Sequence, residues 1–302
     1  MNNSGATLHG VRLITPTARA TLGEGPVWDE RTQTLYWVDI DRGELNQCQA
    51  DGSRLESTKI GQRVCCMALR RKEPGFIAGL ERSIALITLN PLTIRALASV
   101  ELPLASHPLN HRCNDGKCDS AGRFWVGTYT EAATRATDWF FRFDAAGALT
   151  RAAGPFACAN GPAFSLDGKS AYFVDTYGKA VYRYDVSPSG EPSGQRIFKR
   201  FEAEGCGFPD GLTFDVSGCV WIAEWGASRV SRFSPEGELL EVIRLPVCQP
   251  TSCTFGGPGL KRLFITTASQ GLDAASNANG LAGALFAADL EVGGFPAARF
   301  DG

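Results

Sequence analysis

The chain alternates short apolar runs with polar turns over almost its whole length, and helical periodicity is nearly absent. The first clear runs are Pro26–Trp28, Leu35–Asp39 and Glu44–Gln49, with polar turns at 29–33 and 41–43 between them. Short strand-like runs with a turn every eight to twelve residues or so are typical of antiparallel sheet. The pattern therefore predicts a protein built almost entirely of β-strands.

One segment of this pattern recurs along the chain, and it opens with a polar residue followed by glycine. The two clearest copies begin at Asn114 and Asp210. Each has an Asp at +5, a Gly at +8 and a Trp at +11. The looser copies open at Glu24-Gly25-Pro26 and Asn160-Gly161-Pro162.

The copies are regularly spaced. They start near residues 24, 67, 114, 160, 210 and 252, so the period is about 42–50 residues, which matches a four-stranded propeller blade. Repeating sheets without helices close radially and protect their edges. We therefore predict an all-β fold, a six-bladed β-propeller of four-stranded antiparallel blades. A pair of packed β-sandwiches is the alternative, but it does not explain the period.

The predicted propeller has definite ends. We expect residues 1–9 to form a flexible N-terminal tail and residues 10–302 to form a single propeller domain. The strand pattern Gly10–Pro16 is expected to complete the last blade beside Gly283–Leu290, which would join the first and last repeats. Most Trp and Phe residues recur at blade-core positions, so we expect nearly all of them to serve packing.

Charge and composition exclude several classes of function. The net charge is −2, without a block of Lys or Arg, which argues against nucleic acid or a membrane surface as partner. There is no apolar stretch of the length needed to cross a bilayer and no signal-peptide pattern. The ten cysteines lack zinc-finger spacing. We expect a cytoplasmic protein with mostly reduced thiols, and the sequence does not indicate its oligomeric state.

The residues that open the repeats are candidates for a binding site. The first strand of each propeller blade lines the central channel, so Glu24, Asn114, Asn160 and Asp210 should converge at the channel mouth. Two carboxylates and two amides supply the hard oxygen donors that divalent cations such as Ca²⁺, Mg²⁺ and Mn²⁺ prefer. Asp-Gly and Asn-Gly are also ordinary turn dipeptides. Glu is not a favoured turn residue, however, and the matched register across repeats favours a site.

Several motifs in order resemble the SMP-30/gluconolactonase (regucalcin-like) family over residues 20 to about 295. They are Leu22-Gly23-Glu24-Gly25-Pro26-Val27-Trp28, Arg112-Cys113-Asn114-Asp115-Gly116-Lys117, Arg123-Phe124-Trp125-Val126-Gly127-Thr128, Asn160-Gly161-Pro162, Pro209-Asp210-Gly211 and Phe255-Gly256-Gly257. The resemblance also implies a six-bladed propeller.

The resemblance further implies roles for individual residues. Glu24, Asn160 and Asp210 fall on the family's metal ligands, and Arg112 and Asn114 fall on substrate-binding positions. It implies one divalent cation, with Ca²⁺ expected first and Zn²⁺, Mn²⁺, Mg²⁺ or Fe²⁺ as alternatives. The partner it implies is a small-molecule sugar lactone.

Two positions depart from the family pattern. Tyr129 stands where the family usually has Met, and Glu131-Ala132 replaces an acidic pair that some members carry. We expect Glu131 to contact substrate from a loop at 129–139 over the channel mouth.

These features predict metal-dependent hydrolysis of an aldonolactone, such as glucono-, arabinono- or xylonolactone, to the aldonic acid. Asp210 is the candidate base for the attacking water, with the cation as Lewis acid. Arg112 would bind sugar hydroxyls; alternatively, it is a structural arginine paired with Asp115 or another carboxylate. The competing functions are a calcium-binding regulatory protein of the same fold and a promiscuous phosphotriester or ester hydrolase. A Ser-His-Asp hydrolase is not indicated, because the chain has no G-x-S-x-G and only three histidines.

Overall fold

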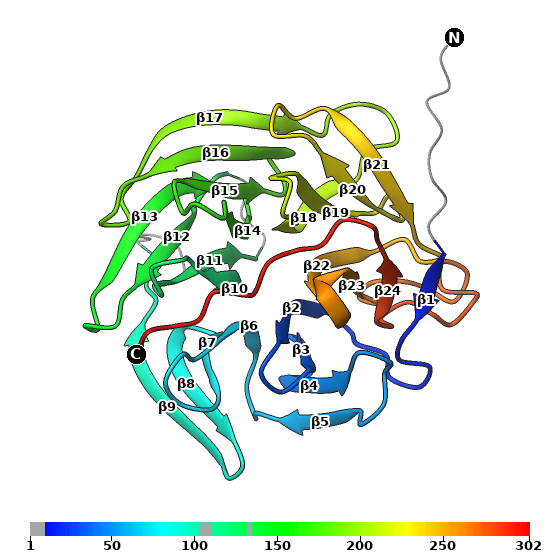
Figure 1. Ribbon diagram of the computed structural model, residues 1–302, viewed down its shortest axis with the longest axis horizontal. Helices are drawn as coiled ribbons and strands as arrows, with labels where there is room; N and C mark the ends of the chain where they lie inside the picture. Colours follow the sequence, from blue (N-terminus) through cyan, green and yellow to red (C-terminus); the bar gives the residue numbers. More distant parts are fainter. Residues whose placement is uncertain (1–9, 103–109, 132–134) are drawn as a thin grey trace.

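The computed structural model describes residues 10–102, 110–131 and 135–302. It contains six four-stranded antiparallel sheets, arranged around a central axis like the blades of a propeller (Figure 1). The predicted fold class is confirmed. The tail predicted at residues 1–9 lies outside the described residues.

Five blades follow the order of the chain, and the first strand of each lies nearest the axis (Figure 1). The first two blades are β2 (Gly23–Asp29), β3 (Thr34–Asp39), β4 (Glu44–Gln49) and β5 (Glu56–Lys59), then β6 (Val64–Leu69), β7 (Phe76–Leu80), β8 (Ser83–Leu89) and β9 (Leu92–Ser99). The next three are β10 (His111–Cys118), β11 (Phe124–Thr130), β12 (Asp138–Phe143) and β13 (Leu149–Phe156); β14 (Ala159–Phe164), β15 (Ser170–Asp175), β16 (Ala180–Val186) and β17 (Pro192–Arg200); and β18 (Phe208–Phe214), β19 (Val220–Trp225), β20 (Arg229–Phe233) and β21 (Leu239–Arg244).

The sixth blade joins the two ends of the chain. It consists of β22 (Pro250–Gly256), β23 (Arg262–Thr267), β24 (Phe286–Asp289) and the N-terminal β1 (Val11–Leu13), and the short 3-10 helix η1 (Pro258–Leu260) connects its first two strands. β1 pairs antiparallel with β24. The predicted closure of the first and last repeats is therefore confirmed.

The clearest repeated feature is a hydrogen-bond network that fixes the turn between the first and second strands. In the third blade, Asp119 accepts hydrogen bonds from the turn amides of Ala121 and Arg123, and its second oxygen accepts one from Trp125 Nε1 at 2.8 Å. Gly122 adopts a φ of 78°, which disfavours residues with a side chain. The fifth blade repeats this arrangement with Asp215, Ser217, Cys219, Gly218 and Trp221. The Asp-Gly-Trp spacing thus marks the fold.

Every first strand is interrupted near the residue that opens its repeat, to within one position, by an irregularity in its pairing with the second strand. In four blades, two residues of the first strand stand opposite one residue of the second, as in a β-bulge. β6 and β22 carry the same kind of register shift near Cys65 and Thr251. A bulge bends the strand and changes the direction of the local side chains. The polar residues that open the repeats lie at these bulges.

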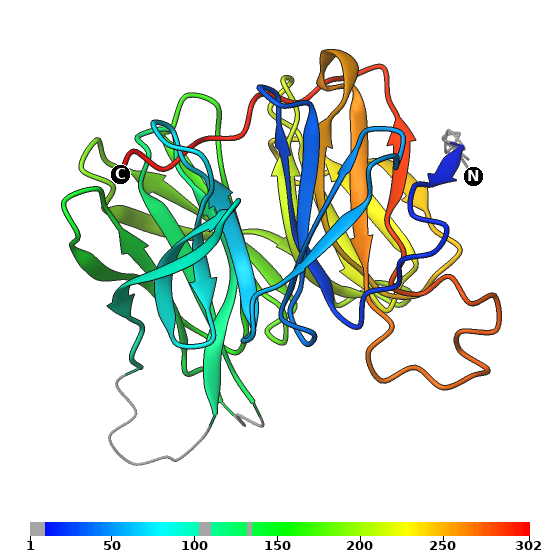
Figure 2. The same cartoon turned by 90° about the horizontal axis from the view of Figure 1, so that it is seen from below.

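The C-terminal segment after β24 crosses one face of the ring toward the third blade (Figures 1 and 2). Arg299 forms a buried ion pair with Asp29. Phe300 exchanges backbone hydrogen bonds with Leu69, the last residue of β6, and with Arg71 just beyond it. The Phe300 ring stacks on Phe143 at 6.0 Å. The segment thus ties the last blade to the first three. The 268–283 loop lies on the opposite face (Figure 2).

Two further findings concern the cysteines and the helical structure. All ten cysteines are free thiols, most of them buried between the strands. Across the described ranges, none of the helical structure has the length or the apolar character needed to traverse a bilayer.

Candidate active site

Glu24, Asn114, Asn160 and Asp210 line one cavity of about 290 Å³. Each lies at the bulge of its first strand, so four separate blades contribute to the same space. All four side chains are buried, with relative exposures of 5–6%. The structure therefore brings together the residues that the repeat pattern singled out.

A chain of hydrogen bonds orders the polar side chains of this cavity. Arg112 Nη1 donates to Asn114 Oδ1 at 2.6 Å, and Asn114 Nδ2 donates to Asn160 Oδ1 at 2.8 Å. The Asn160 amide in turn donates to Thr176 Oγ1 at 3.0 Å. These contacts fix the orientation of both amides, because each has its nitrogen and its oxygen engaged. Sequence reasoning missed Thr176, which follows the second strand of its blade.

The two carboxylates have few partners. Glu24 Oε2 accepts a hydrogen bond from the backbone amide of Gly25 at 3.1 Å. Asp210 Oδ1 is buried, and no described residue donates to it. Burial raises the pKa of Glu24 well above its usual value, and the charges of Asp210 and Asp115 raise it further. Burial, followed by the charge of Asp115, likewise raises the pKa of Asp210. The positive charge of Arg112 acts in the opposite direction on the pKa of both groups, but burial and the neighbouring carboxylates outweigh it. The cavity thus gathers carboxylates whose negative charge is only partly compensated.

Arg112 is not held by a carboxylate. Within the described ranges it has no acidic group at ion-pair distance, and it instead donates to Cys113 O at 3.0 Å and lies 5.0 Å from the centre of the Tyr129 ring. Asp115 lies on the same strand, where its Oδ1 accepts a bond from Gly116 N at 2.7 Å. The alternative in which Arg112 pairs with Asp115 is therefore wrong. Arg112 remains in the cavity, tethered to Asn114.

Glu131 lies at the rim of the same cavity, and about two fifths of its side chain is exposed. It pairs with Arg63 at 3.3 Å, and Arg63 also approaches Glu81 at 3.6 Å and Asp41 at 3.8 Å. Sequence reasoning missed Arg63 and Asp41. The predicted loop over the mouth spans 129–139, of which residues 132–134 lie outside the described residues.

Aromatic residues form one wall of the cavity. Tyr129, Tyr177, Phe208 and Trp225 line it, and the first three form an aromatic row in which the Tyr177 ring lies 6.1 Å from Tyr129 and 6.0 Å from Phe208. The expectation that nearly all Trp and Phe pack in blade cores misses Phe208 and Trp225. A usable signal was present in the repeat, because Tyr129, Tyr177 and Trp225 all stand at or just beyond the end of a second strand.

The fold and this cavity define a class: six-bladed propellers that gather carboxylate, amide and guanidinium groups at one end of the channel, where a cation and a small polar molecule would fit. Within that class, the chain belongs to the SMP-30/Gluconolactonase/LRE-like family, which matches residues 22–269. The family resemblance expected from the motifs is confirmed.

Known proteins resemble the chain over nearly its full length. It is 36% identical to the L-arabinolactonase of Azospirillum brasilense, covering 97% of this chain and 96% of the relative. It is 35% identical to the 6-deoxy-6-sulfogluconolactonase of Pseudomonas putida, covering 94% and 96%. Among solved structures, the calcium-binding protein regucalcin of Agrobacterium tumefaciens superimposes with a TM-score of 0.88 at 25% identity, covering 97% of both chains.

Proposed function

We propose that the protein is a metal-dependent sugar lactonase, which hydrolyses an aldonolactone such as glucono-, arabinono- or xylonolactone to the aldonic acid. Relatives named as lactonases of two different sugars, each aligned over nearly the whole chain, support this class of substrate. The observation that carries the proposal is the buried, unpartnered oxygen of Asp210 in a cavity that also holds Arg112. The cavity thus contains both a carboxylate that would bind a cation or act as a base, Asp210, and a guanidinium suited to sugar hydroxyls, that of Arg112.

The residues present fit a divalent cation. Glu24, Asn160 and Asp210 would hold it, because they offer oxygen donors and because the only partly compensated negative charge at this point calls for a cation. An all-oxygen set favours Ca²⁺, and a similar structure is described as calcium-binding. Zn²⁺, Mn²⁺, Mg²⁺ and Fe²⁺ are the alternatives. When bound, such a cation supplies Lewis-acid stabilisation of the charge that develops on the lactone carbonyl oxygen.

Asp210 is the residue proposed to move the proton. Its free carboxylate oxygen accepts a proton from the water that attacks the carbonyl carbon. The bond from that carbon to the ring oxygen then breaks, and the proton passes to the ring oxygen, which becomes a hydroxyl of the aldonic acid. Burial favours this role, since a desolvated carboxylate holds a proton more readily than an exposed one.

Three residues are proposed to bind the sugar. Arg112 is a planar, multi-donor group suited to hydroxyl and ester oxygens. Asn114 holds Arg112 and Asn160 in place through its amide and meets the substrate beside them. Glu131 lies far enough out at the rim to accept a hydrogen bond from a distal hydroxyl. The aromatic row offers the faces of its rings to the C–H surfaces of the sugar.

A panel of five- and six-membered sugar lactones tests the proposal through acid release, followed with a pH indicator. We expect turnover of at least one lactone, its loss when a chelator removes the metal, and its return when Ca²⁺ or another divalent cation is added. Elemental analysis must show that the metal has left. Turnover that persists in demonstrably metal-free protein would contradict the metal-dependent reaction.

A calcium-binding regulatory protein is the second candidate, favoured by the structural likeness to regucalcin. It predicts Ca²⁺ binding without turnover of any lactone in the panel. Arg112 and the aromatic row favour the enzyme, because a site for the cation alone has no use for them. Phosphotriesters and simple esters added to the panel test the promiscuous hydrolase.

A further inference from the structure

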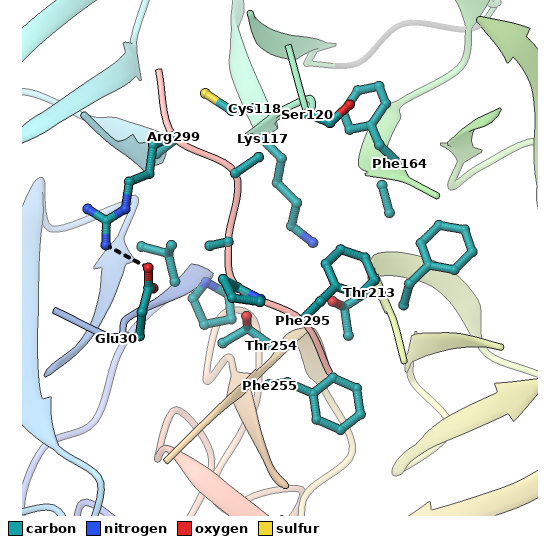
Figure 3. A pocket seen from close by; sticks show the side chains of 18 of the residues that line it. Glu30, Lys117, Cys118, Ser120, Phe164, Thr213, Thr254, Phe255, Phe295 and Arg299 are labelled. Atoms are coloured by element: carbon teal, nitrogen blue, oxygen red, sulfur yellow. Dashed lines mark ion pairs between the residues drawn. The ribbon is translucent and has the colours of Figure 1, made fainter. Parts of the chain in front are cut away.

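A second and larger cavity, of about 410 Å³, lies at the opposite end of the channel. Four first strands, β2, β10, β14 and β18, line both cavities: β10 contributes Asn114 to the candidate active site and Lys117 to this cavity, and β18 contributes Asp210 and Thr213 in the same way. Residues 295–299 of the C-terminal segment line it as they cross the ring (Figure 3). This cavity has no part in the proposed lactone hydrolysis.

Polar groups with unused hydrogen-bonding capacity point into this second cavity. The Lys117 side chain extends from β10 into its middle, where the ammonium donates to the backbone oxygen of Leu212 (Figure 3). An ammonium has three donors, so two remain. No carboxylate of the described residues lies within ion-pair distance of Lys117, and no described residue hydrogen-bonds the hydroxyls of Thr213 or Thr254. An amine and two hydroxyls from three different blades are thus left without full partners.

Four phenylalanines contribute to the walls around these groups. The phenylalanines that line the cavity come from three first strands and from the C-terminal segment: Phe164, Phe214, Phe255 and Phe295. Figure 3 labels Phe164, Phe255 and Phe295. An apolar cavity with a few convergent polar groups is the usual form of a small-molecule site, and about 300–1,000 Å³ is the usual size.

The charge of the lining selects an anion. Four of the charged residues that line the cavity are cationic and one, Glu30, is acidic. Arg299 pairs with Asp29 and Glu30, and Arg71 pairs with Asp301 at 3.3 Å. Arg31 is exposed and donates to the backbone oxygen of Arg71 at 2.9 Å, whereas the Lys117 side chain extends into the middle of the cavity. Lys117 is therefore the cation best placed to meet a ligand.

We propose that this cavity binds a small amphipathic monocarboxylate, an aromatic or branched carboxylic acid of the size class of phenylacetate. Its carboxylate accepts hydrogen bonds from Lys117, Thr213 and Thr254, and its apolar part packs against the phenylalanines. A polyhydroxylated aldonate does not fit this description, because burying its hydroxyls against aromatic walls would leave them without partners. The ligand class is thus different from the substrate and product proposed for the other cavity.

Phenylacetate and its neutral isostere phenylacetamide test the inference, with binding measured by calorimetry or ligand-observed NMR on the full-length, metal-loaded protein. We expect phenylacetate to bind about tenfold or more tightly than the amide, because a charge-assisted hydrogen bond is stronger than a neutral one. Lys117→Met, which keeps the apolar stem, should remove this preference. Lys59→Met, on the exposed outer strand β5, is the matched control and should retain it.

Asp210→Asn separates this cavity from the candidate active site, and phenylacetate should bind that variant as it binds the wild type. Three results would overturn the proposal: equal affinity for phenylacetate and phenylacetamide, undiminished phenylacetate binding by folded Lys117→Met, or loss of binding in Asp210→Asn. If Lys117→Met does not fold, the comparison of the two probes on the wild type decides.

Discussion

Replacing Asp210 by Asn should make the metal-free protein more stable while abolishing its activity. Asp210 Oδ1 is buried without a hydrogen-bond donor among the described residues, and the carboxylate lies near the charges of Glu24 and Asp115. Asn has nearly the same shape and no charge. The substitution therefore removes an only partly compensated buried charge without opening a cavity.

The size of the effect follows from the charge, because Asn keeps a polar atom in the same place. An unpartnered charged group costs more to bury than a neutral one, and the difference is on the order of 1–3 kcal/mol. For a chain of this length, about 1 kcal/mol corresponds to roughly 2 °C in Tm. Chelated Asp210→Asn should therefore melt about 2–6 °C above chelated wild type at neutral pH.

The stability that the metal-free protein gains from Asp210→Asn should increase with pH. The folded state raises the pKa of Asp210, so it holds the proton more tightly than the unfolded chain does. The penalty is absent below the unfolded pKa of about 4 and grows as pH rises toward the folded pKa. The advantage of Asp210→Asn should thus be largest at neutral pH and vanish near pH 4.

Differential scanning calorimetry in chelator, repeated with Ca²⁺ and across pH, measures these effects. Saturating metal should reverse the order, because wild type gains about 2.7 kcal/mol at a metal concentration 100 times Kd and the variant gains little. Asp215→Asn is the control in the same blade. Its carboxylate is fully paired with Trp221 and Arg232, so its loss should destabilise the protein with or without metal. If chelated Asp210→Asn melts no higher than wild type at neutral pH, the assignment of an only partly compensated charge is refuted.

Three further substitutions are informative. Arg112→Met should lower kcat/KM for the lactone about 10–100-fold, the value of one charge-assisted hydrogen bond, while leaving metal-dependent stabilisation intact; equal loss of both would indicate a structural role. Burial raises the pKa of Asp115 to about 6. The chelated wild type should therefore lose stability as the pH rises from about 4 to about 6. Asp115→Asn should flatten that slope in denaturant titrations, and an unchanged slope would assign it to another group. Arg299→Met breaks a buried ion pair and should lower the free energy of unfolding by about 3–5 kcal/mol, checked by guanidinium denaturation; a change under about 1 kcal/mol would show that the C-terminal segment adds little to stability.

The fold could be predicted from the sequence because the repeated residues serve local structure at fixed offsets. The Asp-Gly-Trp spacing after Asn114 and Asp210 corresponds to a turn in which one carboxylate bonds two backbone amides and an indole. Such a turn needs particular residues at fixed offsets, so it leaves a readable pattern. The second blade lacks this pattern, yet the period alone placed it correctly near residue 67.

Only part of the candidate active site could be predicted from the sequence. The residues that open the repeats could be grouped because each occupies the same place in its blade. Phe208 and Arg63 could not, because an aromatic residue or an arginine near a strand end has the same local pattern whether it packs in a blade or faces the channel. The partner of Arg112 also depended on three-dimensional geometry, since the side chain reaches Asn114 and leaves Asp115 on the same strand unpaired with it.

All six first strands share an irregularity in nearly the same place. In four blades it lies at or beside Glu24, Asn114, Asn160 or Asp210, whereas in the second and sixth blades it lies near Cys65 and Thr251, neither of which lines the candidate active-site cavity. The bulged backbone is thus present whether or not it carries a side chain that enters the cavity. During divergence, a ligand could be lost from one blade and gained in another by single substitutions, without rebuilding a strand. The same property makes the site open to redesign, because the ligand set and the scaffold can be varied independently.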